Sequence, residues 1–283
     1  MSTFESAADA IVAGDLETLK QLLRDDLSLV RARSEREHGA TLLHYVSANG
    51  VENSRQKTPQ NIVAVAEMLL KAGAEVDAEA NMYGGGATTL GLVATSIHPY
   101  RAGVQNQLID LLLDHGAEID LEAAASLGRL DVVKRSFNDD GTSKVVHKEV
   151  QSAFLCACGW GRNNVVEFLL DHGAELNDGG GDGQTPLHCA VITGQLETVK
   201  LLLRFKPPLE SHNIYGGSVL GQTLWSAAHG GDPKLFSEII ETLIAAGAEV
   251  PARHVPVNKE IDDLLCRYGS EPEPKWYWYG EGP

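Results

Sequence analysis

The stretch that decides the fold is GQTPLHCAVITGQLETVKLLL, residues 183–203, which joins a glycine-containing turn to two short apolar patterns with helical spacing. Thr185 has the side chain of a helix N-cap, and Pro186 stands at the first helical position, where its missing N–H costs nothing. Leu187 then begins the buried face of the first helix. The stretch therefore predicts a unit of two short helices that follows a turn.

Copies of this unit recur along the chain. The segment DHGAEID at 114–120 returns as DHGAELN at 171–177, and related segments are KAGAEVD at 71–77 and AAGAEVP at 245–251. Each follows an apolar run with helical spacing, which predicts an amphipathic helix ended by a glycine. Counterparts of the TPLH segment stand at 39–46, 87–94, 151–158 and 217–224, whereas the copies at 7–23 and 121–137 lack it but keep two helical patterns.

These motifs resemble the ankyrin repeat, whose signature is T-P-L-H-x-A with a period near 33 residues. Thr185, Pro186, Leu187 and His188 match it letter for letter. The resemblance implies a mostly all-α fold, an ankyrin-repeat solenoid of about seven helix-turn-helix repeats with short hairpin-like finger loops. It also implies that His188 bonds to backbone between repeats. The stretch 83–99 further resembles stand-alone, bacterial-type ankyrin-repeat proteins of unassigned function.

We expect an ankyrin-repeat array over residues 1–251, a single domain with one continuous core, because each unit buries its apolar face only against its neighbours. Its seven units are about 6–34, 35–79, 80–120, 121–147, 148–179, 180–212 and 213–251. Residues 252–283 add a C-terminal capping helix, KEIDDLLCRY, and an aromatic tail that contains Trp-Tyr-Trp-Tyr at 276–279. The tail either folds back onto the cap or serves as a ligand for another protein.

Three units carry insertions between their helices. From the TPLH position to the apolar run of the second helix, the interval is 16 residues in the unit at 185–201 but 27, 23 and 24 in the second, third and seventh units. The inserted stretches, such as 51–60 and 97–103, are polar and rich in turn formers, so we expect loops or helix extensions. They are either tolerated surface growth or part of a binding site. Because loop length costs stability only logarithmically, we expect them to be dispensable for folding.

The net charge limits the classes of partner that the chain can bind. The 283 residues include 39 Asp and Glu against 23 Lys and Arg, which gives a formal net charge of −16. Nucleic acids and anionic membranes repel such a chain, so we expect a basic or neutral protein partner, no nucleic acid and no membrane. The sequence has no stretch of about 18 apolar residues, and acids stand where a signal peptide needs basic residues. We therefore expect a cytoplasmic protein, and we expect a monomer.

No motif for catalysis, a cofactor or a metal is convincing, and we expect none of the three. The glycine-rich loop at 178–185 lacks the Gly-Lys-Ser/Thr of a phosphate loop, and its calcium-loop reading fails at Cys189. Cys156, Cys158 and Cys189 read as small buried thiols. The His115 and His172 turns point to helix C-termini, where a donor meets free carbonyls. The alternative function is an enzyme or small-ligand binder that uses the His98 loop and the Tyr-Gly-Gly fingers.

The candidate partner-binding residues follow from the repeat register. In ankyrin arrays the two residues before the glycine that closes the first helix face the concave groove, which singles out Trp160, Ile192 and Trp225 in three successive repeats. Exposed tryptophan is typical of binding hot spots. The alternative is that both tryptophans turn inward between helices. Tyr83 and Tyr215, each followed by Gly-Gly, complete the candidate set as finger residues. The alternative is that both tyrosines pack tight finger turns.

Overall fold

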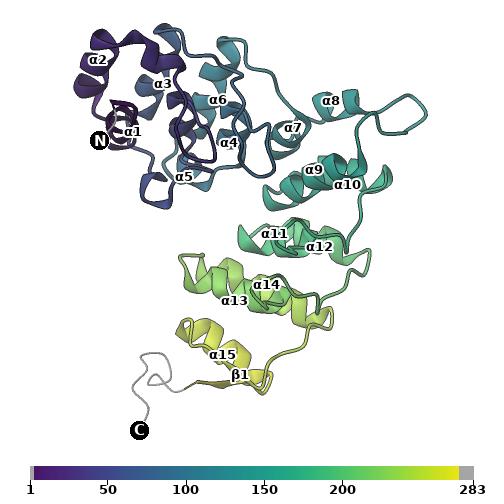
Figure 1. The fold of residues 1–283 in the computed structure, drawn as a ribbon. Helices are drawn as coiled ribbons and strands as arrows, with labels where there is room; N and C mark the ends of the chain where they lie inside the picture. The colour runs from purple at the N-terminus through teal and green to yellow at the C-terminus, as the bar shows by residue number, and fades with distance from the viewer. Residues whose placement is uncertain (1–2, 274–283) are drawn as a thin grey trace. The chain divides into compact units, whose positions relative to one another are not determined.

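The computed structural model describes residues 3–273, and it is mostly helical (Figure 1). Its contacts divide the chain into two compact units, unit 1 (Met1–Ala123) and unit 2 (Ala124–Pro283). Each unit is described by itself below. Within the described residues, no helix is both long and apolar enough to cross a membrane. The expected boundaries of array and cap stay predictions, and the aromatic tail at 276–279 lies outside the described residues.

Unit 1 builds its first three helix pairs around short inner helices. Its elements are α1 (Thr3–Ala13), α2 (Leu16–Asp25), η1 (Leu27–Arg31), η2 (Leu42–Ser47), η3 (Asn53–Arg55), α3 (Ile62–Lys71), α4 (Thr89–Thr95), α5 (Ile97–Arg101) and α6 (Gln105–Asp114). The first helices α1, η2 and α4 pack on one another in that order, and α3 and α6 pack behind them. The next helix, α7 (Leu121–Leu127), crosses the boundary between the units.

Unit 2 continues with more regular pairs. Its elements are α8 (Leu130–Val133), η4 (Lys134–Ser136), α9 (His147–Gly159), α10 (Asn163–Asp171), α11 (Pro186–Ile192), α12 (Leu196–Leu203), α13 (Val219–Ala228), α14 (Pro233–Ala245), β1 (Arg253–His254), α15 (Lys259–Arg267) and β2 (Glu271–Pro272). The inner helix α11 packs between α9 and α13, and α12 packs between α10 and α14. Two residues of β1 pair in parallel with β2. The predicted helical repeat fold is therefore confirmed.

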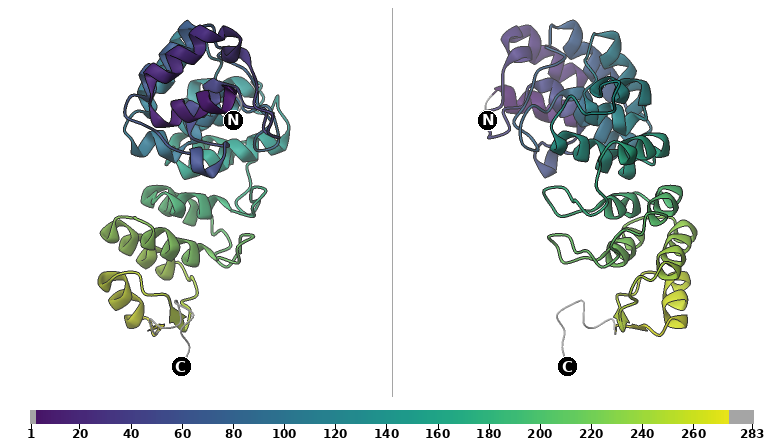
Figure 2. Two further views of the ribbon diagram at one scale, coloured as in Figure 1. Left: turned by 60° about the vertical axis from the view of Figure 1, so that its left-hand side comes forward. Right: turned by 90° about the vertical axis from the view of Figure 1, so that its right-hand side faces the viewer.

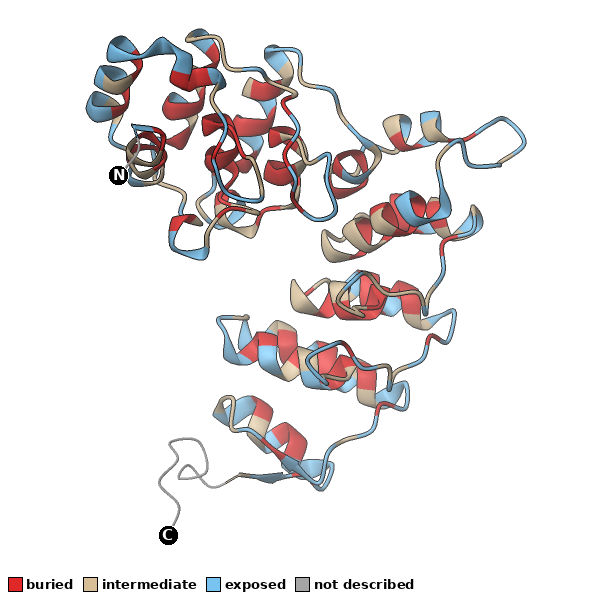
Figure 3. Cartoon of the chain, viewed as in Figure 1, coloured by how far each residue is buried: buried red, intermediate tan, exposed pale blue. Residues whose placement is uncertain are grey.

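The core lies where successive helices face each other (Figure 3). In unit 2 it includes Phe154 of α9, Val191 of α11 and Ile240 of α14, each of which is completely buried. Each pair thus covers the apolar face of its neighbour, as expected for a linear array.

The TPLH histidine ties a repeat to the next one. The Thr185 N–H donates to Nδ1 of His188 at 3.3 Å, and Nε2–H of His188 donates to the carbonyl of Gly217 in the next finger at 3.1 Å. This confirms the expected bond between repeats. In unit 1, His44 accepts from Thr41 N–H at 3.1 Å and donates to the carbonyl of Ala87 at 3.2 Å. Both rings therefore fit only as neutral imidazoles, with one nitrogen accepting and the other donating.

The Asp-His-Gly turns also behave as expected. Nδ1–H of His115 donates to the carbonyl of Leu111 at 2.9 Å, and Nδ1–H of His172 donates to that of Phe168 at 2.7 Å. Each imidazole thus donates to a carbonyl in the last turn of its helix, and the carbonyl of Leu111 also accepts from the backbone N–H of His115 at 3.2 Å.

The insertions differ in form from one another. In the third repeat, 80–120, the inserted residues form α5. In the seventh repeat, 213–251, they lengthen both helices: α13 has 10 residues and α14 has 13, against 7 for α11 and 8 for α12. In the second repeat, 35–79, residues 51–60 fold back onto α1. Arg55 is buried there and forms ion pairs with Glu5 at 2.6 Å and Asp9 at 2.7 Å. The structure therefore argues against the expectation that 51–60 is dispensable for folding.

We predict that Arg55→Ala lowers the free energy of unfolding by about 3 kcal/mol, because it leaves Glu5 without its buried partner. The matched control is Arg36→Ala, which removes an ion pair to Glu5 from a side chain that is 48% exposed, and we expect a loss below about 1 kcal/mol. Urea unfolding of the full chain measures both. Equal losses for the two variants would contradict the assignment of Arg55 as the buried anchor.

Acid should weaken unit 1 through His44. Burial, the largest cause, lowers the pKa of His44 to about 4. Since the pKa in the folded chain lies below the unfolded value of about 6.5, this group's contribution is complete above that value and is lost as the pH falls toward 4. We predict a loss of roughly 3 kcal/mol of stability between pH 7 and 4 from this group. His44→Gln should flatten the dependence measured by urea unfolding, and an unchanged slope would refute this account.

Candidate protein-binding surface

The caps of α11 and α13 fix the register of the candidate groove. Thr185 caps α11, and Ser218 caps α13, where its hydroxyl accepts from Gly221 N–H at 3.2 Å. Because these caps are one repeat apart, Trp225 occupies the position of Ile192. Trp160 ends α9 as its C-cap and, by the same spacing, aligns with Thr193. The three candidate residues therefore lie on two adjacent positions of the repeat.

Trp225 is presented to solvent. Its side chain is 56% exposed and stacks on His229 with ring centroids 4.1 Å apart and an interplanar angle of 19°. Nδ1–H of His229 in turn donates to the carbonyl of Trp225 at 2.7 Å, which holds the stacked ring at the end of α13. The alternative of an inward-turned tryptophan is thus wrong for Trp225. Trp160 and Ile192 are half-buried.

The finger before α13, residues 212–217, places further apolar groups at the surface. Ile214 is 67% exposed and Tyr215 is 79% exposed. Buried Asn213 shapes this loop, because its Oδ1 accepts from the N–H groups of Tyr215 and Gly217, both at 3.0 Å. Sequence reasoning missed Ile214 and Asn213, although an Asn that precedes Tyr-Gly-Gly is typical of an Asx turn.

A second contact joins this finger to its neighbour within unit 2. The N–H of Ile214 donates to the carbonyl of Asp182 at 2.9 Å. The loops that precede α11 and α13 accordingly project side by side (Figure 2). Unit 2 therefore offers a set of exposed or half-exposed apolar side chains on one finger and three inner helices.

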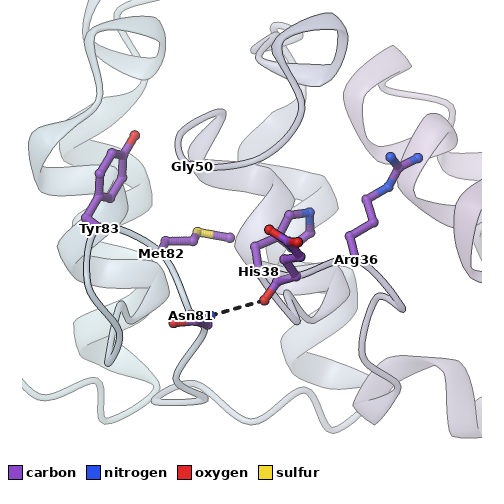
Figure 4. Close-up of a pocket in the computed structure, with 7 residues that line it drawn as sticks. Arg36, His38, Gly50, Asn81, Met82 and Tyr83 are labelled. Atoms are coloured by element: carbon purple, nitrogen blue, oxygen red, sulfur yellow. Dashed lines mark hydrogen bonds between the residues drawn. The ribbon is translucent and has the colours of Figure 1, made fainter.

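In unit 1, Tyr83 lies beside a hollow of about 580 Å³ (Figure 4). The residues that line it are Arg36, Glu37, His38, Gly50, Asn81, Met82 and Tyr83. Tyr83 is 76% exposed, and its hydroxyl donates to Oδ1 of Asn49 at 2.6 Å. Tyr83 and Tyr215 belong to different units, so the two Tyr-Gly-Gly fingers are separate features.

The His98 loop forms part of α5. His98 is half-buried, and burial, assisted by Arg101, lowers its pKa. Tyr100 is 56% exposed. None of these three side chains lines the hollow beside Tyr83, so the parts of the alternative site are not brought together there.

The cysteines behave as apolar groups. Cys158 is completely buried, Cys156 and Cys189 are half-buried, and none of the three forms a disulfide. Burial raises the pKa values of the Cys158 and Cys189 thiols, so both stay protonated at neutral pH. Within residues 3–273 no group of three or more His, Cys, Asp and Glu side chains is arranged to hold a metal ion.

Successive helix pairs, each preceded by a projecting loop and packed only on its neighbours, define a helical repeat protein. Residues 121–213 match the family model of ankyrin repeats in three copies. Residues 121–213 are therefore similar to ankyrin repeats.

Three relatives are similar to parts of this chain, and two of them are named for ankyrin repeats. The human BCL-6 corepressor-like protein 1 is 33% identical over 169 residues, which are 58% of this chain and 8% of that protein. The human Ankyrin repeat and SOCS box protein 16 is 24% identical over 76% of this chain and 43% of its own length. A Putative ankyrin repeat protein of Rickettsia bellii (strain RML369-C) is 32% identical over 41% of this chain and 47% of its own length. The chain thus spans less than half the length of each of these relatives.

We predict that Trp225→Ala changes the free energy of unfolding by less than about 1 kcal/mol, because an exposed ring leaves no cavity when it is removed. Urea unfolding of the variant measures this. A loss of about 3 kcal/mol or more, the usual cost of emptying a core aromatic site, would show that the ring supports the fold.

Proposed function

We propose that this chain is a non-catalytic protein-binding module that presents a concave ankyrin groove to a basic or neutral protein partner, as an inhibitor or an adaptor. The observation that carries the proposal is the exposed, stacked ring of Trp225 at the end of an inner helix. Ankyrin repeats are generally protein-binding modules, which supports the class of function. The proposed partner-binding residues are Trp160, Ile192, Trp225 and Tyr215 in unit 2 and, as a separate candidate, Tyr83 in unit 1.

Burial of these side chains by a partner supplies the driving force. Large aromatic side chains remove much apolar area from water at little cost in conformational entropy, and tryptophan and tyrosine are enriched at binding hot spots. The rigid inner helices hold Trp225 and Ile192 in place before the partner arrives, which reduces the ordering cost of binding. Ile214 joins the proposed surface on the evidence of its exposure.

The net charge of −16 supports a basic or neutral partner in the cytoplasm. The bacterial type inferred from residues 83–99 also stays a proposal, and the relative from Rickettsia bellii supports it. The alternative function, an enzyme or small-ligand binder that uses the His98 loop and the Tyr-Gly-Gly fingers, is less favoured because its side chains do not share the hollow beside Tyr83.

Affinity capture with the purified full chain tests the proposal. We expect to capture a stoichiometric protein partner from the native lysate, and we expect Trp225→Ala to lower its recovery. With the purified partner, Trp225→Ala should weaken the binding free energy by more than about 2 kcal/mol. The matched control is Phe205→Ala, since Phe205 is 50% exposed but follows the second helix of its repeat. Equal effects of the two substitutions, or retention of a small molecule only, would contradict the proposal.

The charge argument gives a kinetic prediction for the same pair. The association rate constant should fall as salt is raised from low to physiological ionic strength, because the Debye length shrinks to about 8 Å and screens the attraction. Stopped-flow association at several salt concentrations measures it. A rate that rises with salt would indicate an acidic partner and would refute the proposed charge complementarity.

A further inference from the structure

We propose that the hollow beside Tyr83 in unit 1 is a pocket for a lysine or arginine side chain of the protein partner. This inference rests on the proposed protein-binding function and adds a chemical specificity to it. It follows from three features of the hollow: its apolar floor, its aromatic wall and the exposed carboxylate of Glu37 at its rim.

Met82 and Gly50 form the floor. Met82 is 4% exposed and packs against Gly50, where an added Cβ would stand 2.5 Å from the Met82 sulfur. Figure 4 shows the Met82 side chain extending under Gly50 from the same segment that carries Tyr83. A thioether beside a bare backbone offers a smooth apolar surface for the methylene stem of a lysine or arginine, whose charged end stays in water.

Tyr83 forms the wall, and its place is held by unusual backbone. Tyr83 has φ 53° and Ala48 has φ 49°, and among residues 3–273 the only other non-glycine residue with positive φ is Lys206. Of these three left-handed residues, Tyr83 lines the hollow. The hydroxyl of Tyr83 is anchored on Asn49, and its ring is 76% exposed, which leaves a face open for a cation. Strained backbone of this kind concentrates at functional positions, and a guanidinium or ammonium binds well over a tyrosine face.

The lining of the hollow contains one arginine, Arg36, and one carboxylate, Glu37. Arg36, at its edge, is already paired with Glu5 and Glu52, and Arg55 with Glu5 and Asp9. Oε2 of Glu52 is nevertheless buried and has no hydrogen-bond partner within the described residues.

The rim adds a further carboxylate. Glu37 lines the hollow and is exposed, and no ion pair of its side chain occurs in the part of the chain that the structure describes. A cation that enters would therefore meet uncompensated negative charge, whereas an acidic side chain would be repelled.

The histidine of the hollow fits the same polarity. Nδ1 of His38 accepts from Ala40 N–H at 3.0 Å, so its proton lies on Nε2, 3.8 Å from Oε1 of Glu52. Nε2 has no hydrogen-bond partner among residues 3–273.

Methyl NMR of the full chain tests the pocket directly. The chain has 3 methionines, Met1, Met68 and Met82, so labelled methionine methyl groups give a spectrum that single substitutions assign. The probes are the blocked pentapeptides Gly-Gly-Lys-Gly-Gly and Gly-Gly-Arg-Gly-Gly, with Ala and Glu at the centre as comparison peptides. We expect the Lys and Arg peptides to shift the Met82 methyl signal with saturation and to leave the Met68 signal unchanged. Equal shifts with the Ala or Glu peptide would overturn the proposal.

Two substitutions locate the contacts. Glu37→Gln should lower the affinity for the Lys peptide about threefold, and Tyr83→Ala should lower it about fivefold. The matched controls are Glu35→Gln on the same exposed segment and Tyr215→Ala in unit 2, which should leave this titration unchanged. Tyr83→Phe keeps the ring without its anchor and serves if Tyr83→Ala does not fold.

Loss of affinity with the controls, or none with Glu37→Gln, would refute the pocket. If a partner is captured in a manner that depends on Trp225 but the peptides do not bind, the pocket is rejected and the proposed function stands. Peptide binding without any protein partner would instead reject the proposed function.

Discussion

The structure depends on a buried imidazole that is bonded at both nitrogens. In His188, one nitrogen holds the start of its own helix and the other holds the next finger, and His44 repeats the arrangement in unit 1. A helical hairpin cannot bury its apolar face alone, so stability comes from the interface with its neighbour. The histidine adds directional bonds to that non-directional burial and thereby fixes the spacing of fingers. Where Gly91 and Gly221 replace it, the hydroxyls of Thr88 and Ser218 still cap the helices, but this link is missing.

Much of the fold could be predicted because short sequence motifs in each repeat determine where its helices begin, which face they bury and where they end. The Thr-Pro-Leu-His entry, the apolar spacing and the Asp-His-Gly turns each state a cap, a buried face or a helix end. The fate of 51–60 could not be predicted, since its polar composition is typical of a loop. Burial of Arg55 depends on Glu5 and Asp9, which lie almost 50 residues earlier and carry no signal of their own.

The candidate site could be predicted from the sequence only in part. Register identified Trp225 as a candidate surface residue and paired Trp160 with Thr193, but it did not show that Trp225 is exposed while Trp160 is half-buried. The Tyr-Gly-Gly pattern left open whether Tyr83 and Tyr215 pack the finger turns or face solvent. The hollow beside Tyr83 could not be predicted, because its lining residues come from three separate segments, 36–38, 50 and 81–83. Such convergence is a property of packing and has no local sequence pattern.

The central claim is that the inner helices and fingers bind a protein. Hydrogen–deuterium exchange of the full chain, with and without its captured partner, tests this most directly. The account predicts slower exchange at residues 212–230, the finger and end of α13, with unchanged exchange in the second helices α12 and α14. Protection confined to α12 and α14, with residues 212–230 unaffected, would contradict it.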